Sequence, residues 1–284
     1  MPGRMIRLAF STNAYKKNTL AEAVDSIASI GYRGVEVMAD VPHALPGRMT
    51  PAERRDLGKR VRDGGQQVSN VNAFTLFACG DTYHPTWVEH DAAKRQARVD
   101  HTIQAIELAA EIGARTVSLQ PGGPLIGTGL SREQAADRYA EGLAKVVPTA
   151  RACGVVLGIE PEPGLFIQDS AEYLAFKRQF FPDEPHVLMN CDAGHLFCVG
   201  EDPAAVIRAH HRHVAHVHLE DIGENRVHQH LTPGRGAMDF PAIFRALTDV
   251  GYTGWATVEL YPYETTAAGV AKAAYDHLTP MLPK

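Results

Sequence analysis

The sequence predicts an α/β protein that folds as a single (β/α)8 barrel, a TIM barrel, over residues 1–284. Short apolar runs rich in Val and Ile alternate with longer segments of helical periodicity, and there are eight such runs. No linker or low-complexity stretch divides the chain into parts. Because strands separated by helices pair in parallel through βαβ crossovers, eight consecutive units indicate one closed barrel.

Eight strands are expected at the apolar runs. Their ranges are 6–13, 34–39, 67–74, 116–121, 155–161, 187–192, 214–220 and 255–261. A doubly wound open sheet is the alternative arrangement, and it needs a glycine-rich turn after the first strand to seat a dinucleotide. The first strand is followed by STNAYKKN, which contains no glycine, so the closed barrel is the favoured prediction.

Helices are predicted from periodicity and from the residues at their ends. Segment 92–112 is the clearest, because Val99, Ile103 and Ile106 recur along one face. Capping residues, with proline or a capping-box partner, indicate helix starts at Thr50-Pro51, Asp202-Pro203 and Ser131 with Gln134. Glycines suited to a left-handed C-cap indicate helix ends at Gly31, Gly113 and Gly251.

Composition narrows the class of protein. Apolar residues make up 45% of the chain and charged residues 21%, an ordinary balance for a globular protein. The formal net charge is −5 and Lys and Arg are scattered, so a nucleic-acid partner is not expected. No apolar run is long enough to span a bilayer, and the N-terminus lacks the pattern of a signal peptide. The four Cys residues show no CxxC spacing, which favours reduced thiols. We therefore expect a cytoplasmic protein without a membrane partner, and homo-oligomer formation stays open.

Four of the predicted strands end in residues that commonly bind metals. The fifth ends at Glu160 in LGIEPEP, the sixth at Asp192 in MNCDAGH, the seventh at His218 in AHVHLED and the eighth at Glu259 in ATVELYP. In a barrel of this kind the carboxyl ends of the strands meet at one mouth, where catalytic groups lie. A single acidic residue at a strand end is more often a helix cap or a surface group, but four metal-binding residue types at the ends of consecutive strands favour a shared site.

The alternation of side chains along these strands supports the same site. The neighbours on the other face are apolar, as expected for side chains that pack against helices: Ile159, Cys191, Val217 and Val258. The residues on the same face are small or polar, as expected near a barrel mouth: Gly158, Asn190, His216 and Thr257. On all four strands, the metal-binding residue type thus falls on the face expected to point into the barrel.

A divalent cation explains why three carboxylates would be placed together. Without a cation, carboxylates this close repel one another and raise one another's pKa. Three oxygen ligands with one imidazole nitrogen form a mostly hard set, which favours Mn²⁺ or Mg²⁺, with Co²⁺, Fe²⁺ and Zn²⁺ as alternatives. We therefore expect one divalent ion, with Mn²⁺ preferred.

Several segments together resemble a known group of enzymes. IEPEPG, CDAGH, HVHLED, HLTPGRGAMDF and VELYP resemble the xylose-isomerase-like sugar phosphate isomerase/epimerase superfamily, and the resemblance covers nearly the whole chain. This group includes ketose 3-epimerases, hydroxypyruvate isomerase, inosose-processing enzymes and, more distantly, apurinic endonucleases. In the ketose 3-epimerases the pattern implies one metal held by Glu, Asp, His and Glu. These positions correspond to Glu160, Asp192, His218 and Glu259, and the two Glu residues are also the implied proton-transfer pair.

The expected function is therefore a metal-dependent isomerase or epimerase acting on a ketose, a cyclitol ketone or a similar polyol. Removing a hydrogen next to a ketone forms an enediolate, which a metal stabilises, and epimerisation needs an acid and a base on opposite faces of the carbon. A dehydratase on the same fold begins with the same step and stays open. An apurinic-endonuclease-like hydrolase and a non-catalytic ligand-binding barrel are less favoured.

Further residues are candidates for substrate binding. His195 matches the Asp-x-x-His pattern of the epimerases, in which the His contacts substrate oxygens. A structural role in the loop is the alternative interpretation. Arg226 follows His218 at a spacing longer than that in the epimerases. His230, at the start of HLTPGRG, could hydrogen-bond a ligand, with loop packing as the favoured alternative. Glu162 completes the set, either lining the site or lying behind the metal ligands.

A few other positions have a structural interpretation beside the functional one. Glu36 and Asn72, at strand ends, could contact substrate, but a structural role is the favoured interpretation. Phe74, Phe77 and Trp87 are expected to form an apolar lid or wall of the site, with core packing as the equal alternative. Gly122-Gly123 could bind a phosphate through backbone amides, but a tight turn is the favoured interpretation. Since no cluster of Lys or Arg accompanies these glycines, we expect an unphosphorylated substrate.

Overall fold

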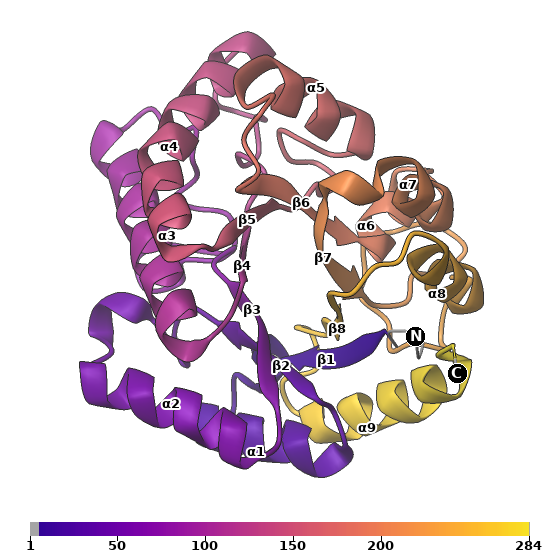
Figure 1. Ribbon diagram of the computed structural model, residues 1–284. Coiled ribbons are helices and arrows are strands. Elements are labelled where there is room, and N and C mark those ends of the chain that lie inside the picture. The colour runs from indigo at the N-terminus through magenta and orange to yellow at the C-terminus, as the bar shows by residue number, and fades with distance from the viewer. Residues whose placement is uncertain (1–5, 284) are drawn as a thin grey trace.

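The computed structural model describes residues 6–283 and confirms the predicted barrel. Eight parallel strands close on themselves in sequence order, and Figure 1 shows this central ring surrounded by helices. The strands are β1 (Arg7–Ser11), β2 (Gly34–Met38), β3 (Gln67–Asn72), β4 (Thr116–Leu119), β5 (Val156–Ile159), β6 (Val187–Asp192), β7 (Val214–Leu219) and β8 (Trp255–Val258). The ring is closed by β8 pairing with β1, where Val258 lies beside Phe10.

The helices form the outer layer of the barrel. They are α1 (Leu20–Ile30), α2 (Pro51–Asp63), α3 (Ala92–Ile112), α4 (Arg132–Cys153), α5 (Ser170–Phe180), α6 (Ala193–Cys198), α7 (Pro203–His210), α8 (Phe240–Asp249) and α9 (Ala267–Leu278). Short 3₁₀ turns are η1 (Thr12–Tyr15), η2 (Pro46–Arg48), η3 (His211–His213) and η4 (Thr279–Met281). Figure 1 shows α9, at the end of the chain, next to α1, near its beginning.

Local sequence signals set the helix ends as predicted. Thr50 and Ser131 each form a capping box, and Asp202 caps α7 by accepting the N–H of Ala204. Gly31 and Gly113 end α1 and α3 with φ of +117° and +86°, a left-handed backbone that side chains rarely adopt. These signals fix where each helix starts and therefore where each strand-to-helix loop ends.

Most strands are shorter than predicted at their carboxyl ends. The strand β4 ends at Leu119 and β8 at Val258, because the chain beyond these residues turns into the loops of the barrel mouth. Beyond the ends of several strands, one further backbone hydrogen bond joins the chain to the neighbouring strand. Glu160 donates its N–H to the carbonyl of Leu119, and Glu259 donates to that of Leu219. Both side chains are therefore held by backbone at the first position of a loop.

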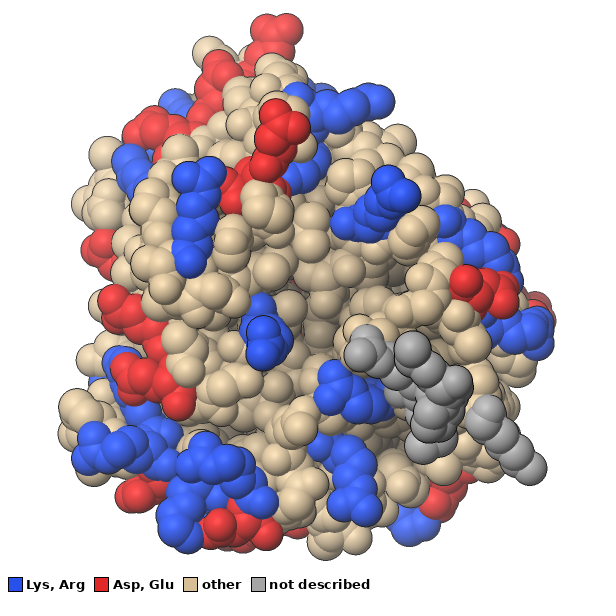
Figure 2. All heavy atoms as spheres, viewed as in Figure 1, with Lys and Arg blue, Asp and Glu red and all other residues tan. Residues whose placement is uncertain are grey.

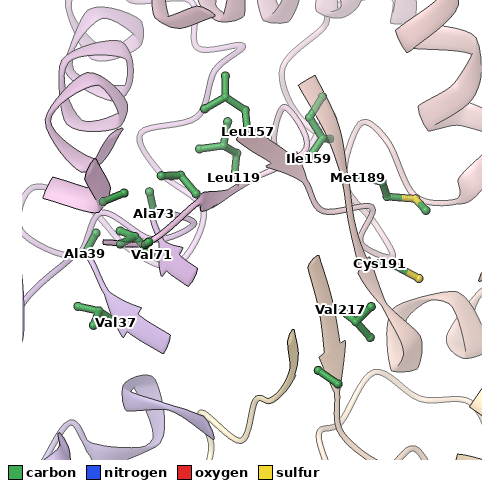
Figure 3. Close-up of a cluster of buried hydrophobic side chains, with 14 of the residues drawn as sticks. Val37, Ala39, Val71, Ala73, Leu119, Leu157, Ile159, Met189, Cys191 and Val217 are labelled. Carbon is green, nitrogen blue, oxygen red and sulfur yellow. The ribbon is translucent and has the colours of Figure 1, made fainter. Parts of the chain in front are cut away.

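The apolar core fills the layer between the strands and the helices. Ile159, Cys191 and Val217 are fully buried and point from their strands toward the surrounding helices, as Figure 3 shows. Val258 belongs to the same core. The predicted phase of these four strands is therefore confirmed. Burial of each large aliphatic side chain contributes about 1.5–3 kcal/mol, so this layer is the main source of stability.

The inside of the barrel is polar in the half that lies below the mouth. Ser69 hydrogen-bonds Thr257 across the barrel at 3.2 Å, and Asn70 donates to Ser118 at 2.9 Å. A barrel interior is more often filled with branched apolar residues. Gly158 leaves room here, since a Cβ on it would lie 3.2 Å from the Cβ of Asn190. The small and polar lining leaves room for long polar side chains to meet inside the barrel.

The outer surface carries both signs of charge. Figure 2 shows one face of the molecule, on which Lys and Arg are interspersed with Asp and Glu. The helix α2 combines both signs in the sequence PAERRDLGKRVRD. Among residues 6–283, none of the helices has the length and apolar character needed to cross a membrane.

Candidate metal centre

Four side chains from consecutive strands meet at the barrel mouth. Asp192 is the last residue of β6, His218 lies near the end of β7, and Glu160 and Glu259 come directly after β5 and β8. One potential ligand atom from each lies within 4.8 Å of the others, and all four side chains are buried. The structure thus brings together the four residues that the sequence indicated.

The imidazole of His218 lies at the centre of this group. Its Nδ1 atom is 2.9 Å from Oε1 of Glu160, 3.8 Å from Oδ2 of Asp192 and 3.8 Å from Oε2 of Glu259. Nδ1 is therefore the imidazole atom that faces the carboxylates. The opposite nitrogen, Nε2, points away from them toward β2.

Two of the carboxylates are held by one oxygen each. Oδ1 of Asp192 accepts the backbone N–H of His195 at 2.7 Å and caps α6. Oε1 of Glu259 accepts from the side-chain amides of Asn13 and Asn72 at 2.8 and 3.0 Å. These bonds fix the two carboxylates and leave Oδ2 and Oε2 for another partner.

Unpartnered oxygens at this point fit a cation. Among the described residues, Oε2 of Glu160 and Oδ2 of Asp192 have no hydrogen-bond partner although they are buried. Buried polar atoms are rarely left without a partner, and an unpaired buried charge is costly. A divalent ion would satisfy both oxygens, and three carboxylates with one imidazole suit such an ion. The residues present therefore fit one divalent metal.

The electrostatics of the site also favour a cation. Burial raises the pKa of Glu160 and, with the neighbouring carboxylates, raises the pKa of Glu259 well above its usual range. Burial lowers the pKa of His218, but Glu36 and the site carboxylates outweigh it and raise that pKa well above the usual value. Burial acts to raise the pKa of Asp192, yet attraction by the surrounding imidazoles lowers it. Protons are thus held where a cation would be favourable.

A cavity of about 390 Å³ opens above these residues. Glu160 and Glu259 line it, and Phe74 and Phe77 supply apolar surface. A larger depression of about 970 Å³ lies between α1 and α2, but it is open and contains none of the strand-end residues. Since catalysis in barrels takes place at the strand ends, the smaller cavity is the candidate active site.

Three imidazoles line this cavity next to the carboxylates. Nδ1 of His195 lies 3.1 Å from the carbonyl of Pro161, and Nδ1 of His230 lies 2.9 Å from that of Glu259. A carbonyl can only accept, so both Nδ1 atoms carry hydrogen and, in the neutral rings, both Nε2 atoms carry the lone pair. Burial lowers the pKa of His195 to about 3 and of His230 to about 4, so both are neutral.

His228 joins these two and was not singled out from the sequence. Its Nε2 lies 3.1 Å from Nε2 of His230, and one nitrogen from each of the three rings falls within 4.8 Å of the others. This spacing is also compatible with a cation, although the cluster lacks carboxylates. The HQH spacing in the loop is the sequence signal that could have found His228.

Glu162 lies on the cavity wall and is almost fully buried. Its Oε1 accepts the hydroxyl of Tyr83 at 3.0 Å. Burial, helped by the charge of Glu160, raises the pKa of Glu162 well above its usual range. Tyr83 was missed by sequence reasoning, because no periodic signal marks a residue in the long loop between β3 and α3.

A family comparison agrees with this geometry. The model of the xylose isomerase-like TIM barrel family matches residues 24–281. The chain belongs to this family.

The similar proteins of known name share little sequence identity with this chain. An inosose dehydratase from Clostridium perfringens is 25% identical over 270 residues, with 86% of this chain and 83% of that protein covered. A D-psicose 3-epimerase from Clostridium cellulolyticum H10, solved with D-tagatose, has a TM-score of 0.78 at 18% identity and covers 97% of this chain and 99% of its own. A zinc-bound IOLI protein has a TM-score of 0.77 at 16% identity, with 97% and 99% covered. At these identities the two structures show the shared fold.

Arg226 lies apart from the site of this family member. Its Nη1 donates to the carbonyl of Phe197 at 2.9 Å, and the guanidinium stacks on the Phe197 ring at 4.4 Å. It lines a separate cavity of about 200 Å³ beside α6 and α7. The prediction that Arg226 binds substrate is not supported, since the loop after β7 turns this side chain outward.

Of the remaining aromatic and glycine positions, some line the cavity and the others have a packing role. Trp87 does not line the cavity but is fully buried, with its ring 5.5 Å from that of Tyr139. Core packing is thus its role, whereas Phe74 and Phe77 form the wall that was expected. Gly122 and Gly123 adopt φ of +94° and +117° in a tight turn. A Cβ on Gly122 would lie 2.8 Å from the Phe166 ring, so glycine is explained by packing.

Glu36 and Asn72 both lie under the site. Asn72 lines the cavity and holds Glu259, as described above. Glu36 is fully buried on β2 and is 2.7 Å from Nε2 of His218. Neither residue is an isolated structural group, since each contacts a candidate metal ligand.

Proposed function

We propose that this protein is a metal-dependent isomerase or epimerase that moves a proton next to the ketone of a sugar or cyclitol. The observation that carries the proposal is the convergence of Glu160, Asp192, His218 and Glu259, with buried carboxylate oxygens left without partners. These four residues would hold one divalent ion. When bound, the ion supplies electrophilic stabilisation of the negative charge that develops on the substrate oxygen.

The protein's own groups would then move the proton. Glu160 and Glu259 reach the cavity from strands β5 and β8, and we propose that they act on opposite faces of the reacting carbon. Asn13 and Asn72 hold one oxygen of Glu259 and so keep its other oxygen oriented. For epimerisation, one Glu takes the proton and the other, in its acid form, donates a proton to the opposite face. For isomerisation, the proton returns to the neighbouring carbon.

We propose an unphosphorylated substrate. Among the described residues that line the cavity, Lys16 is the only Lys or Arg, and its ammonium lies 2.8 Å from Glu264. A phosphate would therefore meet no free cation there. The neutral imidazoles of His195 and His230 and the Glu162–Tyr83 pair offer donors and acceptors for hydroxyl groups. The size and mixed lining of the cavity suit a monosaccharide or a cyclitol.

Mn²⁺ is the proposed ion. Three carboxylates favour a hard cation, and one imidazole favours Mn²⁺ over Mg²⁺. Zn²⁺ is the main competitor, because the IOLI protein of the same fold was solved with zinc. Co²⁺ and Fe²⁺ bind the same kinds of ligand.

A dehydratase is the second candidate, and the inosose dehydratases among the relatives favour it. Dehydration begins with the same proton removal next to a ketone, but a hydroxyl group then leaves from the adjacent carbon. The same Glu pair could provide the base for the first step and the acid for the second. The two candidates therefore share a site and differ in the fate of the enediolate.

Deuterium exchange tests the shared step and separates the two outcomes. Protein loaded with Mn²⁺ is incubated in D₂O with a panel of ketohexoses and inososes, and the products are followed by NMR and mass spectrometry. An isomerase or epimerase yields deuterated products of unchanged composition, whereas a dehydratase yields products that have lost water. Absence of both reactions with a ligand seen bound beside the metal would favour the non-catalytic binding barrel instead.

A further inference from the structure

We propose that Glu36 is a positioning residue that orients His218 for metal binding by accepting the hydrogen of its Nε2. The inference rests on the proposed metal site and concerns how the protein builds it. Glu36 lies on β2 and His218 on β7, so two strands separated in the ring by β8 and β1 meet through these two side chains.

The two nitrogens of His218 face different partners. Nε2 lies 2.7 Å from Oε2 of Glu36, and Nδ1 lies 2.9 Å from Oε1 of Glu160 on the other side of the ring. A neutral imidazole carries hydrogen on one nitrogen and a lone pair on the other. An ionised carboxylate can only accept, so contact with Glu36 places the hydrogen on Nε2. Glu160 faces Nδ1 in the same way, so both nitrogens can carry hydrogen while no metal is bound. A metal would displace the hydrogen on Nδ1, because Glu36 holds the one on Nε2.

Glu36 is itself held in place by donors. Asn70 donates to its Oε2 at 2.9 Å, Asn72 donates to its Oε1 at 3.2 Å, and Nε2 of His216 lies 3.5 Å from Oε2. The side chain is fully buried. Burying a carboxylate costs free energy unless it is paired and hydrogen-bonded, and these contacts meet that need. The orientation of the Glu36 carboxylate is therefore fixed before any metal binds.

Neither substrate contact nor a metal of its own explains Glu36. It does not line the cavity, so no contact with substrate is expected. Glu36, His216 and His218 do have ligand-type atoms close together. Oε2 of Glu36, however, already accepts from Asn70 and lies at hydrogen-bond distance from Nε2 of His218, so unlike the free oxygens of Glu160 and Asp192 it needs no cation.

This arrangement has a direct effect on the metal. A carboxylate on the far nitrogen fixes the ring orientation and raises the basicity of the nitrogen that binds the ion. Loss of such a partner typically lowers metal affinity by about 10- to 100-fold. We therefore expect Glu36 to act on metal affinity without touching either metal or substrate.

The test compares Glu36→Gln with a matched control. Gln keeps the shape and can still accept one hydrogen bond, but it lacks the charge. Glu184→Gln is the control, because Glu184 is also buried and ion-paired, with Arg151, but it precedes β6 at the other end of the barrel. The affinity of each protein for Mn²⁺ and Co²⁺ is measured by competition with a chelator. We expect Glu36→Gln to bind about 10-fold more weakly or worse, and Glu184→Gln to bind like the wild type.

A second measurement needs no variant and so does not depend on folding of Glu36→Gln. Wild-type protein labelled with ¹⁵N-histidine and loaded with Zn²⁺ is examined by NMR, and hydrogen on Nε2 of His218 is expected. Hydrogen on Nδ1, or unchanged metal affinity in Glu36→Gln, overturns the role of Glu36 while leaving the metal site in place. Failure of wild-type protein to bind any divalent ion overturns the proposed function as well.

Discussion

At the residue scale, individual side chains of the site are held by the protein through one atom and face the site with another. Asp192 caps α6 with Oδ1 and presents Oδ2 to the site, and Glu259 is anchored through Oε1 and presents Oε2. His218 contacts Glu36 through Nε2 and presents Nδ1. The scaffold thus orients each group before a ligand arrives, which reduces the cost of binding.

The first prediction concerns the two Glu residues. Glu160→Gln and Glu259→Gln each keep the shape and one ligand oxygen but remove the proton-transfer group. Each should retain some metal and lose proton exchange by about 10²–10⁴-fold, the usual contribution of a general acid or base. Exchange of the substrate hydrogen in D₂O measures this directly. Near wild-type exchange with metal bound would contradict the Glu pair and turn attention to His216 or His230.

The second prediction separates a cavity residue from one outside it. His195→Ala should raise KM more than it lowers kcat, because the neutral imidazole lines the cavity and is expected to contact substrate oxygens. Arg226→Ala should leave both constants within about twofold of wild type, since its guanidinium packs on Phe197. Steady-state kinetics on the substrate found in the exchange panel provide the measurement. A large rise in KM for Arg226→Ala would restore it as a substrate contact.

At the scale of elements, the strands and helices were largely predictable and the loops were not. Glu160, Asp192, His218 and Glu259 could be found because alternation along a strand is a local property that sequence displays. Arg226 could not be placed, because the path of the loop after β7 depends on packing against α6 and α7. Residues from loops, and contacts across the barrel, depend on tertiary structure and had no sequence signal of comparable strength.

The helix α3 lies outside the site but holds the loop between β3 and α3, which forms part of the cavity wall. Arg98, fully buried on α3, donates to the carbonyls of Ala73, Phe74 and Pro85 and so ties both parts of this loop together. The loop carries Tyr83, as well as Phe74, into the cavity wall. The buried guanidinium of Arg98 therefore helps to hold the wall of the candidate active site, together with Asp40, which accepts the N–H groups of Phe77 and Ala78.

The third prediction follows from this clamp. Arg98→Met leaves buried carbonyls without donors, which should lower the free energy of unfolding by about 3 kcal/mol. It should also raise KM, because Phe74 and Tyr83 lose their fixed positions. Denaturant unfolding and steady-state kinetics measure the two effects. Arg55→Met, an exposed change on α2, is the control, and equal stability of the two variants would refute the clamp.

At the scale of the whole molecule, closure of the barrel makes the site. Residues far apart in sequence, such as Glu36 and His218, meet only because β1 pairs with β8 and the ring is complete. The polar residues inside the ring contribute less stability than an apolar filling would, and the apolar layer outside the strands offsets this. The barrel thus exchanges some core stability for a set of buried, oriented ligands.

The most direct test of this account is the metal content of the purified protein. After removal of metals and reloading with Mn²⁺, elemental analysis should find bound metal in wild-type protein and in Arg226→Ala. Glu160→Ala and Asp192→Ala should retain far less, because each removes a ligand, and circular dichroism should show that both remain folded. Equal metal content in the wild type and in these two ligand variants would contradict the proposed metal centre.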